Sequence, residues 1–272
     1  MKKLITILVL MVICFYHINP VLATNTHSID LEKDSSQYLS ITDANQTGLD
    51  ITGDFSFSFW MKRESFNTYQ GLISKKGDEG GNYRMYIDSD NRLTGTYLSS
   101  TGGTDDVILR VDAGNTSSAW QYITMTADVS EKIIKIYVNN SEQTATYLRT
   151  NATSVGTNSG SCFVGCMQNT GDTGQNFLDG LMDEIGIWSR VLTSSEISDI
   201  YNSGDGLEYS SFSSSLKTDL EAYWKLDNNL LDETSNNNDL TNNNSAVFSS
   251  SVPFAGGEEE EEETFIPQIL IY

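Results

Sequence analysis

The sequence predicts an all-β protein: an antiparallel two-sheet sandwich with one short α-helix. Short segments in which apolar and polar residues alternate recur along the chain, and turn-forming Gly, Asn and Asp residues separate them. Only the segment that follows residue 192 combines helical periodicity with a helix start signal. Because the strands do not alternate with helices, the pattern favours antiparallel pairing over a parallel strand–helix–strand fold.

The expected strands follow one another at short intervals. In chain order they are residues 28–32, 38–41, 55–62, 72–75, 83–88, 92–97, 107–111, 120–128, 133–138, 144–148, 162–167, 178–188 and 220–226. The clearest is 55–62, in which Phe55 and Phe59 point to one face and Ser56 and Lys62 to the other. One face of this strand must therefore be core.

Residues 177–201 begin as a strand and end as the one helix. Strict alternation would place Leu178, Met182 and Trp188 on one face and Phe177, Leu181, Ile185 and Ile187 on the other, as in a strand covered on both sides. Thr193 and Glu196 then stand at the N-cap and N3 positions of a capping box, and Asn202-Ser203-Gly204 supplies the stop. A helix of about two turns with one apolar side is expected to lie on the sandwich.

The motif FLDGLMDEIGIWSRVLTSSEI, which begins at Phe177, resembles the closing motif of LamG-like domains. These domains, which include laminin G and pentraxin-type modules, belong to the concanavalin A-like lectin/glucanase superfamily. The upstream segments SIDLEKDSSQYLSI, GLDITGDFSFSFWMKRES and WQYITMTADVSEKIIKIYVNN follow the order found in that family. The resemblance covers most of residues 28–255 and implies a jelly roll that binds ligands, although a fold alone does not fix a function.

The charge of the chain narrows the choice of partners. The formal net charge is −21, from 37 acidic and 16 basic residues. Such a surface disfavours binding to nucleic acids and to anionic membranes. We expect no nucleic acid partner and no membrane insertion. Cations, neutral glycans and cell-surface or extracellular proteins are better candidates.

Both ends of the chain differ from its centre in composition. Residues 1–23 have the basic start, apolar run and small-residue end of a secretory signal peptide, so we expect a secreted or cell-surface protein. Residues 24–255 are expected to form one LamG-like domain. Residues 256–272 contain the run Glu258 to Glu263, which predicts a disordered acidic tail.

Two cysteines, Cys162 and Cys166, remain after the leader. Four residues of extended strand separate them by about 13 Å, which exceeds the reach of a disulfide. We expect two free thiols, with a bridge through a tight loop as the alternative. Together with His27 they are too few for a structural zinc site.

Catalysis has little support in the sequence. A glucanase of this superfamily would need carboxylates in a Glu-x-Asp-x-x-Glu pattern, but the nearest match starts at Glu32 and has Gln37 at its last position. Asp183 and Glu184 are adjacent and would point to opposite faces of a regular strand, while Asp179 and Asp183 would lie about 13 Å apart. We therefore expect a protein that is not an enzyme, with a glycoside hydrolase as the less favoured alternative.

Calcium is the metal that the sequence suggests. Asp232, Asn236 and Asn238 supply hard oxygen atoms over one short turn, and Asp183 resembles the family residue that approaches that turn. The alternative is an Asx-rich loop that satisfies its own backbone. We keep both readings open and take these four residues as the candidate Ca²⁺ site.

Aromatic side chains are the candidates for sugar binding. Trp60 shares a strand face with Ser56 and Lys62, and Tyr83 and Tyr97 lie on hairpins where an exposed ring could stack on a pyranose. Burial in the core is the more common fate of such residues. The function we expect is non-catalytic, calcium-assisted recognition of a glycan or a cell-surface ligand. The alternative is a structural or adhesive protein without a small ligand.

The segment 220–255 occupies an unusual place in the order. Its sequence AYWKLDNNLLDETSNNNDLT resembles a segment that comes first in many LamG-like proteins, whereas here it comes last. First and last strands can be neighbours in a sandwich. We expect residues 220–226 to pair within the same sandwich in permuted order.

Overall fold

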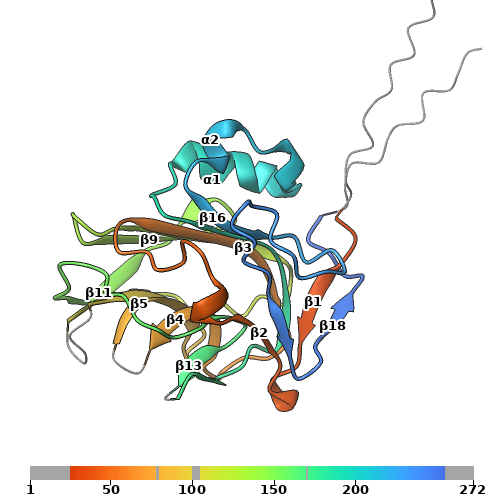
Figure 1. Ribbon diagram of the computed structural model, residues 1–272, viewed down its shortest axis with the longest axis horizontal. Helices are drawn as coiled ribbons and strands as arrows, with labels where there is room; N and C mark the ends of the chain where they lie inside the picture. The colour runs from red at the N-terminus through yellow and green to blue at the C-terminus, as the bar shows by residue number, and fades with distance from the viewer. Residues whose placement is uncertain (1–24, 78–79, 100–104, 170, 255–272) are drawn as a thin grey trace, which may run out of the picture.

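The computed structural model describes residues 25–77, 80–99, 105–169 and 171–254. Two antiparallel sheets of eight strands each form a sandwich, so the all-β jelly-roll prediction is confirmed (Figure 1). The expected signal peptide and acidic tail lie outside the described residues. No helix in the described ranges is both long and apolar enough to span a bilayer.

The strands are β1 (Ser28–Leu31), β2 (Tyr38–Ile41), β3 (Phe55–Arg63), β4 (Gln70–Gly77), β5 (Gly80–Ile87), β6 (Leu93–Leu98), β7 (Asp106–Val111), β8 (Gln121–Asp128), β9 (Ile133–Val138), β10 (Ser141–Glu142), β11 (Ala145–Thr150), β12 (Cys162–Val164), β13 (Met167–Asn169), β14 (Thr173–Gln175), β15 (Gly180–Trp188), β16 (Leu220–Trp224), β17 (Thr241–Asn243) and β18 (Val247–Ser249). The helices are α1 (Ser194–Tyr201) and the single-turn α2 (Ser214–Lys217), with 3₁₀ turns at Lys33–Ser35, Asp43–Asn45, Asn202–Gly204 and Tyr209–Ser211.

The first sheet, which we call sheet A, has the order β10-β9-β8-β3-β15-β1-β18, and β16 also pairs with β15. The second, sheet B, has the order β11-β7-β6-β5-β4-β12-β2-β17. The inner faces of the two sheets enclose one core, to which Phe55, Phe57 and Phe59 of β3 contribute as the alternation predicts. Strands β13 and β14 form a separate hairpin.

A β-bulge interrupts β15 at its centre. Asp183 opposes Trp60 of β3, and the next paired residue, Gly186, opposes Ser58, so β15 has one residue more than its partner between these pairs. Glu184 lies in the bulge with φ +49°, a left-handed conformation that is uncommon for a residue with a side chain.

The bulge changes which side chains face the core. Met182 and Ile185 both lie in the core between the sheets, whereas Trp188 lies in a second cluster on the outer side of sheet A. Asp183 and Glu184 both point to that outer side. The strict alternation expected for this strand is therefore wrong beyond Met182, as is the expectation that the two carboxylates point to opposite faces.

Helix α1 covers the outer side of sheet A together with α2 (Figure 1). Its predicted start is confirmed: the Thr193 hydroxyl accepts from the Glu196 amide at 3.2 Å, and Glu196 accepts from the Thr193 amide at 2.9 Å. Ile197 and Ile200 are buried against sheet A. The helix ends at Asn202 in the left-handed conformation.

The C-terminal strands pair with early strands of both sheets. Strand β16 pairs with β15, β17 with β2, and β18 with β1. Trp224 of β16 is fully buried, and its indole N–H donates to the Asn238 carbonyl at 2.7 Å. Segment 220–249 thus supplies strands of the sandwich and is not an appendage to it.

Candidate functional site

The loop that carries Asp232, Asn236 and Asn238 satisfies its own polar groups. Asp232 accepts from the amides of Tyr223 and Asn238, both at 2.9 Å. The Asn238 side chain is fully buried and bonds both the amide and the carbonyl of Thr47. These bonds engage the side-chain oxygen atoms of Asp232 and Asn238 that a calcium ion would need.

Asp183 does not join that loop. Asp232 lies along the edge of β16 that faces away from β15, as its bridge to Trp224 shows, so β16 runs between the two aspartates. Asp183 instead accepts from the Asn25 side chain at 2.8 Å. The four predicted ligands therefore do not form one site, because strand pairing separates them by about two strand spacings, roughly 9–10 Å.

The three predicted sugar-binding aromatics are all buried. Tyr83 and Tyr97 are 0% exposed in the core between the sheets, and Trp60 is 4% exposed beneath α1, where it stacks on Tyr201. None of these rings presents a face to a ligand. The expectation that Tyr83 and Tyr97 could be exposed is wrong, because their hairpins turn these side chains inward.

The two cysteines are free and buried, as expected. Burial raises the pKa of Cys162 to about 11, which leaves its thiol protonated and poorly nucleophilic at neutral pH. Burial also raises the pKa of Cys166. Neither thiol is a candidate for catalysis.

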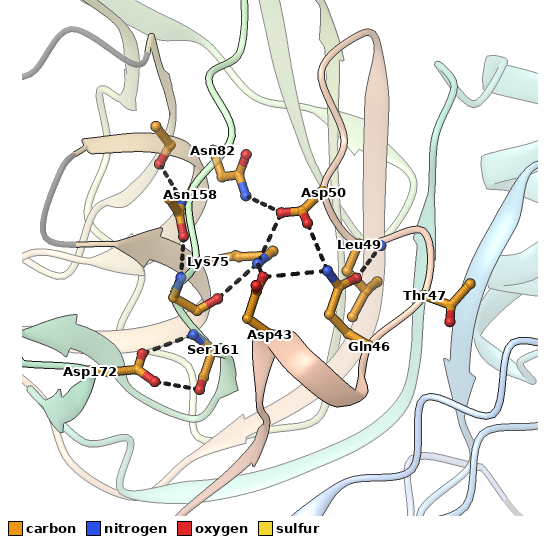
Figure 2. A network of polar contacts seen from close by, with 12 residues as sticks. Asp43, Gln46, Thr47, Leu49, Asp50, Lys75, Asn82, Asn158, Ser161 and Asp172 are labelled. Atoms are coloured by element: carbon orange, nitrogen blue, oxygen red, sulfur yellow. Dashed lines mark hydrogen bonds and ion pairs between the residues drawn. The ribbon is translucent and has the colours of Figure 1, made fainter.

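Lys75 is a buried lysine, a residue type that often carries chemistry (Figure 2). Its Nζ lies 2.9 Å from Asp43, 3.0 Å from Asp50 and 2.8 Å from the Gly160 carbonyl. These three acceptors match the three ammonium hydrogens. Lys75 therefore acts as a clamp that holds the loop after β2 and the loop before β12 against β4.

One carboxylate cluster has the spacing of a cation site. Asp30, Glu32 and Glu64 each offer an oxygen, and these oxygens lie within 4.8 Å of one another. Burial, followed by the charge of Asp179, raises the pKa of Asp30, and burial likewise raises the pKa of Glu64. In the described part of the chain, this is the group of three acidic, Cys or His side chains that could hold one ion. The sequence does not reveal this cluster, because Asp30 of β1 and Glu64, which follows β3, are far apart in the chain. They meet only because β1 and β3 both pair with β15.

A groove opens at the rim of the sandwich where strands of both sheets end. We call it the rim groove. Its volume is about 360 Å³, which is within the usual range for small-ligand sites. It is lined by Leu93, Val111, Ala113, Gly114, Asn115, Thr116, Ser117, Gln121, Val138 and Gln143. Strands β6 and β7 of sheet B and β8 and β9 of sheet A thus each contribute an end.

Buried Arg63 fixes the loop that forms one wall of this groove. Its guanidinium donates to the Asn115 carbonyl at 2.7 Å and to the Asn91 side chain at 3.1 Å. Burial lowers the pKa of Arg63 to about 10, which leaves it charged at neutral pH. A side chain at Gly114 would come within 2.4 Å of the Asp90 carbonyl, so only glycine permits this approach.

The groove presents neutral hydrogen-bonding groups. Asn115 donates to Gln121 Oε1 at 2.7 Å, which leaves the Gln121 amide N–H₂ without an acceptor among the described residues. Gln143 donates to the Ser141 carbonyl at 2.8 Å, which leaves Gln143 Oε1 as an acceptor. Leu93, Val111 and Val138 add apolar surface. In the sequence, residues 113–119 are only a polar stretch between two expected strands, because the groove exists only when four strand ends meet.

Comparisons with known proteins place this fold. Residues 33–198 match the family model described as the concanavalin A-like lectin/glucanases superfamily. The search of curated proteins found no match.

Two similar solved structures show the same architecture. One is a protein from Bacteroides ovatus to which carbohydrate binding has been ascribed (16% identity, 82% of this chain and 59% of that one, TM-score 0.57). Another is the heptameric SAP-like pentraxin of Limulus polyphemus (15% identity, 67% of this chain and 84% of that one, TM-score 0.51). The chain therefore spans little more than half of the Bacteroides protein. At these identities the likeness shows the fold alone.

Proposed function

Because the family model matches more than half of its residues, this chain belongs to the concanavalin A-like lectin/glucanase superfamily, and we propose that it is a non-catalytic carbohydrate-binding module. The observation that carries the proposal is the rim groove, whose walls combine amide and hydroxyl groups with aliphatic side chains. Sugars present hydroxyl groups around an apolar ring surface, so a wall of this kind complements them.

The described residues that line the groove offer no group for acid–base catalysis. None of them is an Asp, Glu, His, Lys or Cys. Glycoside hydrolysis requires two carboxyl groups that flank the scissile bond. Although the bulge places Asp183 and Glu184 on one side of sheet A, they are 0% and 3% exposed. A polysaccharide would have to displace the N-terminal segment and the helix layer to reach them.

The proposal also includes export of the protein and binding of a calcium ion. A signal peptide would deliver the module to the extracellular glycans and proteins that we propose as its partners. The expected ligands Asp183, Asp232, Asn236 and Asn238 do not fit an ion together, so we assign no role in glycan binding to calcium. The cluster of Asp30, Glu32 and Glu64 fits better as a stabilising site for Ca²⁺, because three hard oxygen ligands meet there.

Glycan-array binding followed by calorimetry tests the proposal. Gln121→Ala and Gln143→Ala should each weaken binding of the best glycan by about two- to tenfold, since one hydrogen bond contributes about 0.5–1.5 kcal/mol. Thr153→Ala, a change to an exposed loop residue outside the groove, should leave the affinity unchanged. A glycan that binds both groove variants as tightly as the native protein would contradict this location.

A further inference from the structure

The outer face of sheet B carries an unusual set of side chains next to the rim groove. On β5, β6 and β7 the core receives Tyr83, Met85, Tyr97, Leu109 and Val111. The intervening residues therefore point outward: Arg84 and Tyr86 on β5, Thr94 and Thr96 on β6, and Ile108 and Arg110 on β7. Two arginines and one tyrosine thus share one sheet face with small polar residues between them.

Among the described residues these arginines have no acidic partner, although the chain has 37 acidic and only 16 basic residues. In the part of the chain that the structure describes, neither Arg84 nor Arg110 forms an ion pair. The Nε–H of Arg84 is buried and lacks an acceptor. A guanidinium group without an acidic partner can bind an external carboxylate through its N–H donors.

The carboxylates near this face are already engaged. Asp88 pairs with Arg92 at 3.0 Å, and Asp106 pairs with Arg149 at 3.2 Å. Asp112 accepts from the Thr146 hydroxyl at 2.7 Å and, among the described residues, forms no ion pair with Arg110. Because Asp88 and Asp106 pair with other arginines, Arg84 and Arg110 remain available to an external carboxylate.

An aromatic strip lies beside the arginines. The guanidinium carbon of Arg84 lies 5.6 Å from the centre of the Tyr86 ring, and Tyr86 stacks on Tyr69 with centroids 6.3 Å apart. Tyr69 is 47% exposed. Thr94 lies between Tyr86 and Arg110 in the strand ladders but is 0% exposed, so it underlies this surface and does not contact a ligand. An aromatic surface beside a cation suits a sugar ring that bears a carboxylate.

The surface formed by the two arginines and the two tyrosines, which we call the strip, is continuous with the rim groove. Leu93 and Val111 line the groove, and the adjacent residues Thr94 and Arg110 belong to the outer face of sheet B. Thr94 and Arg110 are also direct partners in the β6–β7 ladder. A saccharide chain that leaves the groove over this edge would meet Arg110 on β7 first. Tyr86 lies two strands away on β5, and Arg84 lies two residues from Tyr86 along that strand.

We propose that the ligand is an acidic glycan, one unit of which fills the rim groove while a carboxylate-bearing unit lies on the strip formed by Tyr69, Arg84, Tyr86 and Arg110. This inference rests on the proposed function, because it assigns the chemical class of the glycan that the groove accepts. The two guanidinium groups bind the carboxylate, and Tyr69 and Tyr86 contact the ring.

Two probes and their matched neutral forms test the inference. Oligogalacturonate and sialyllactose carry the carboxylate on a hexuronic and on a sialic acid, and methyl esterification removes the charge while the rest of each sugar is kept. The native protein should bind at least one acid at least tenfold more tightly than its ester. Which acid is preferred identifies the source of the carboxylate, and binding of the acid should weaken with added salt.

Variants show which residues produce the preference. Arg84→Gln and Arg110→Gln should each lower affinity for the acid by about five- to tenfold and leave affinity for the ester unchanged, while Arg110→Lys should keep part of the preference. Lys135→Gln removes the same charge from β9 of sheet A and is the matched control. Melting curves confirm that each variant is folded.

The outcomes separate this inference from the proposed function. Equal affinity for acid and ester, or a preference that both arginine variants keep, would overturn the acidic-glycan inference. If neutral glycans bind and Gln121→Ala weakens them, the proposed function stands while the inference fails. A protein that binds neither the acids nor any neutral glycan contradicts both.

Discussion

The hydroxyl of Tyr223 donates to Glu184 Oε2 in the interior of the protein, on the outer side of sheet A. Glu184 is 3% exposed, and its other carboxyl oxygen has no hydrogen-bond partner in the part of the chain that the structure describes. Burial raises the pKa of Glu184 despite the bond from Tyr223, and burial followed by the charge of Glu184 raises the pKa of Asp183. The folded protein therefore favours the protonated form of this carboxyl pair.

Glu184→Gln should flatten the pH dependence of stability. A folded pKa above the unfolded value means that the stabilisation is complete below the unfolded pKa, near 4.5, and is lost as the pH rises toward the folded pKa. The native free energy of unfolding should therefore fall by up to about 1.4 kcal/mol per pH unit in that window. A glutamine at position 184 stays neutral, so the free energy of unfolding of the variant should fall less as the pH rises.

Urea unfolding at pH 5, 7 and 9 measures this difference. Glu233→Gln, a change at an exposed residue, is the control and should follow the native curve. The other charged groups around the pair, Asp227, Glu208 and Lys225, remain in both proteins. Parallel curves for native protein and Glu184→Gln would show that Glu184 ionises normally.

Thr193→Ala should destabilise the protein by about 0.5–2 kcal/mol without changing glycan affinity, because it removes the N-cap of α1. No residue of α1 lines the rim groove. Chemical denaturation and calorimetry give the two readouts, and Ser195→Ala within the same helix is the control. A loss of binding at unchanged stability would show that α1 contributes to the ligand site.

Glu196 links the same cap to acid stability. Burial raises its pKa, but the hydrogen bonds from Arg190 and Thr193 prevail and lower it to about 2. The stabilisation is thus present above the unfolded pKa near 4.5 and is lost as the pH falls toward 2. Glu196→Gln should therefore lose less stability than the native protein between pH 5 and 2.5. Equal losses in acid titrations of the two proteins would contradict this assignment.

Calcium at millimolar concentration should raise the melting temperature, and a chelator should lower it, because an ion that binds only the folded state stabilises it. Glu64→Gln should abolish this response, since Glu64 completes the cluster with Asp30 and Glu32. Asp232→Asn should destabilise the protein equally with and without calcium, because Asp232 bonds its own loop. Melting that is insensitive to chelator would exclude the site.

Deletion of residues 207–272 should abolish cooperative folding. The deletion removes β16, which buries Tyr223 and Trp224, and also β17 and β18, which pair with both sheets. Deletion of residues 255–272 alone is the matched control and should leave the melting transition unchanged. If the longer deletion still melts cooperatively at a similar temperature, the C-terminal segment is an appendage.

Some features of this protein follow from the sequence alone because their causes are local. The alternation in β3 sets which phenylalanines face the core, and the spacing of Thr193 and Glu196 sets the helix start, since neither depends on a distant partner. The LamG-like motif at Phe177 likewise predicted the jelly roll that the family match confirms.

The tertiary structure decided what depends on strand pairing. The bulge at Glu184 reverses the alternation of β15, and the position of β16 keeps Asp183 away from Asp232. The inner face of sheet B takes Tyr83 and Tyr97, while the rim groove forms only where the ends of β6, β7, β8 and β9 meet. Hydrogen bonds between strands far apart in the chain set these positions, and a local pattern of residues does not encode which strands will pair.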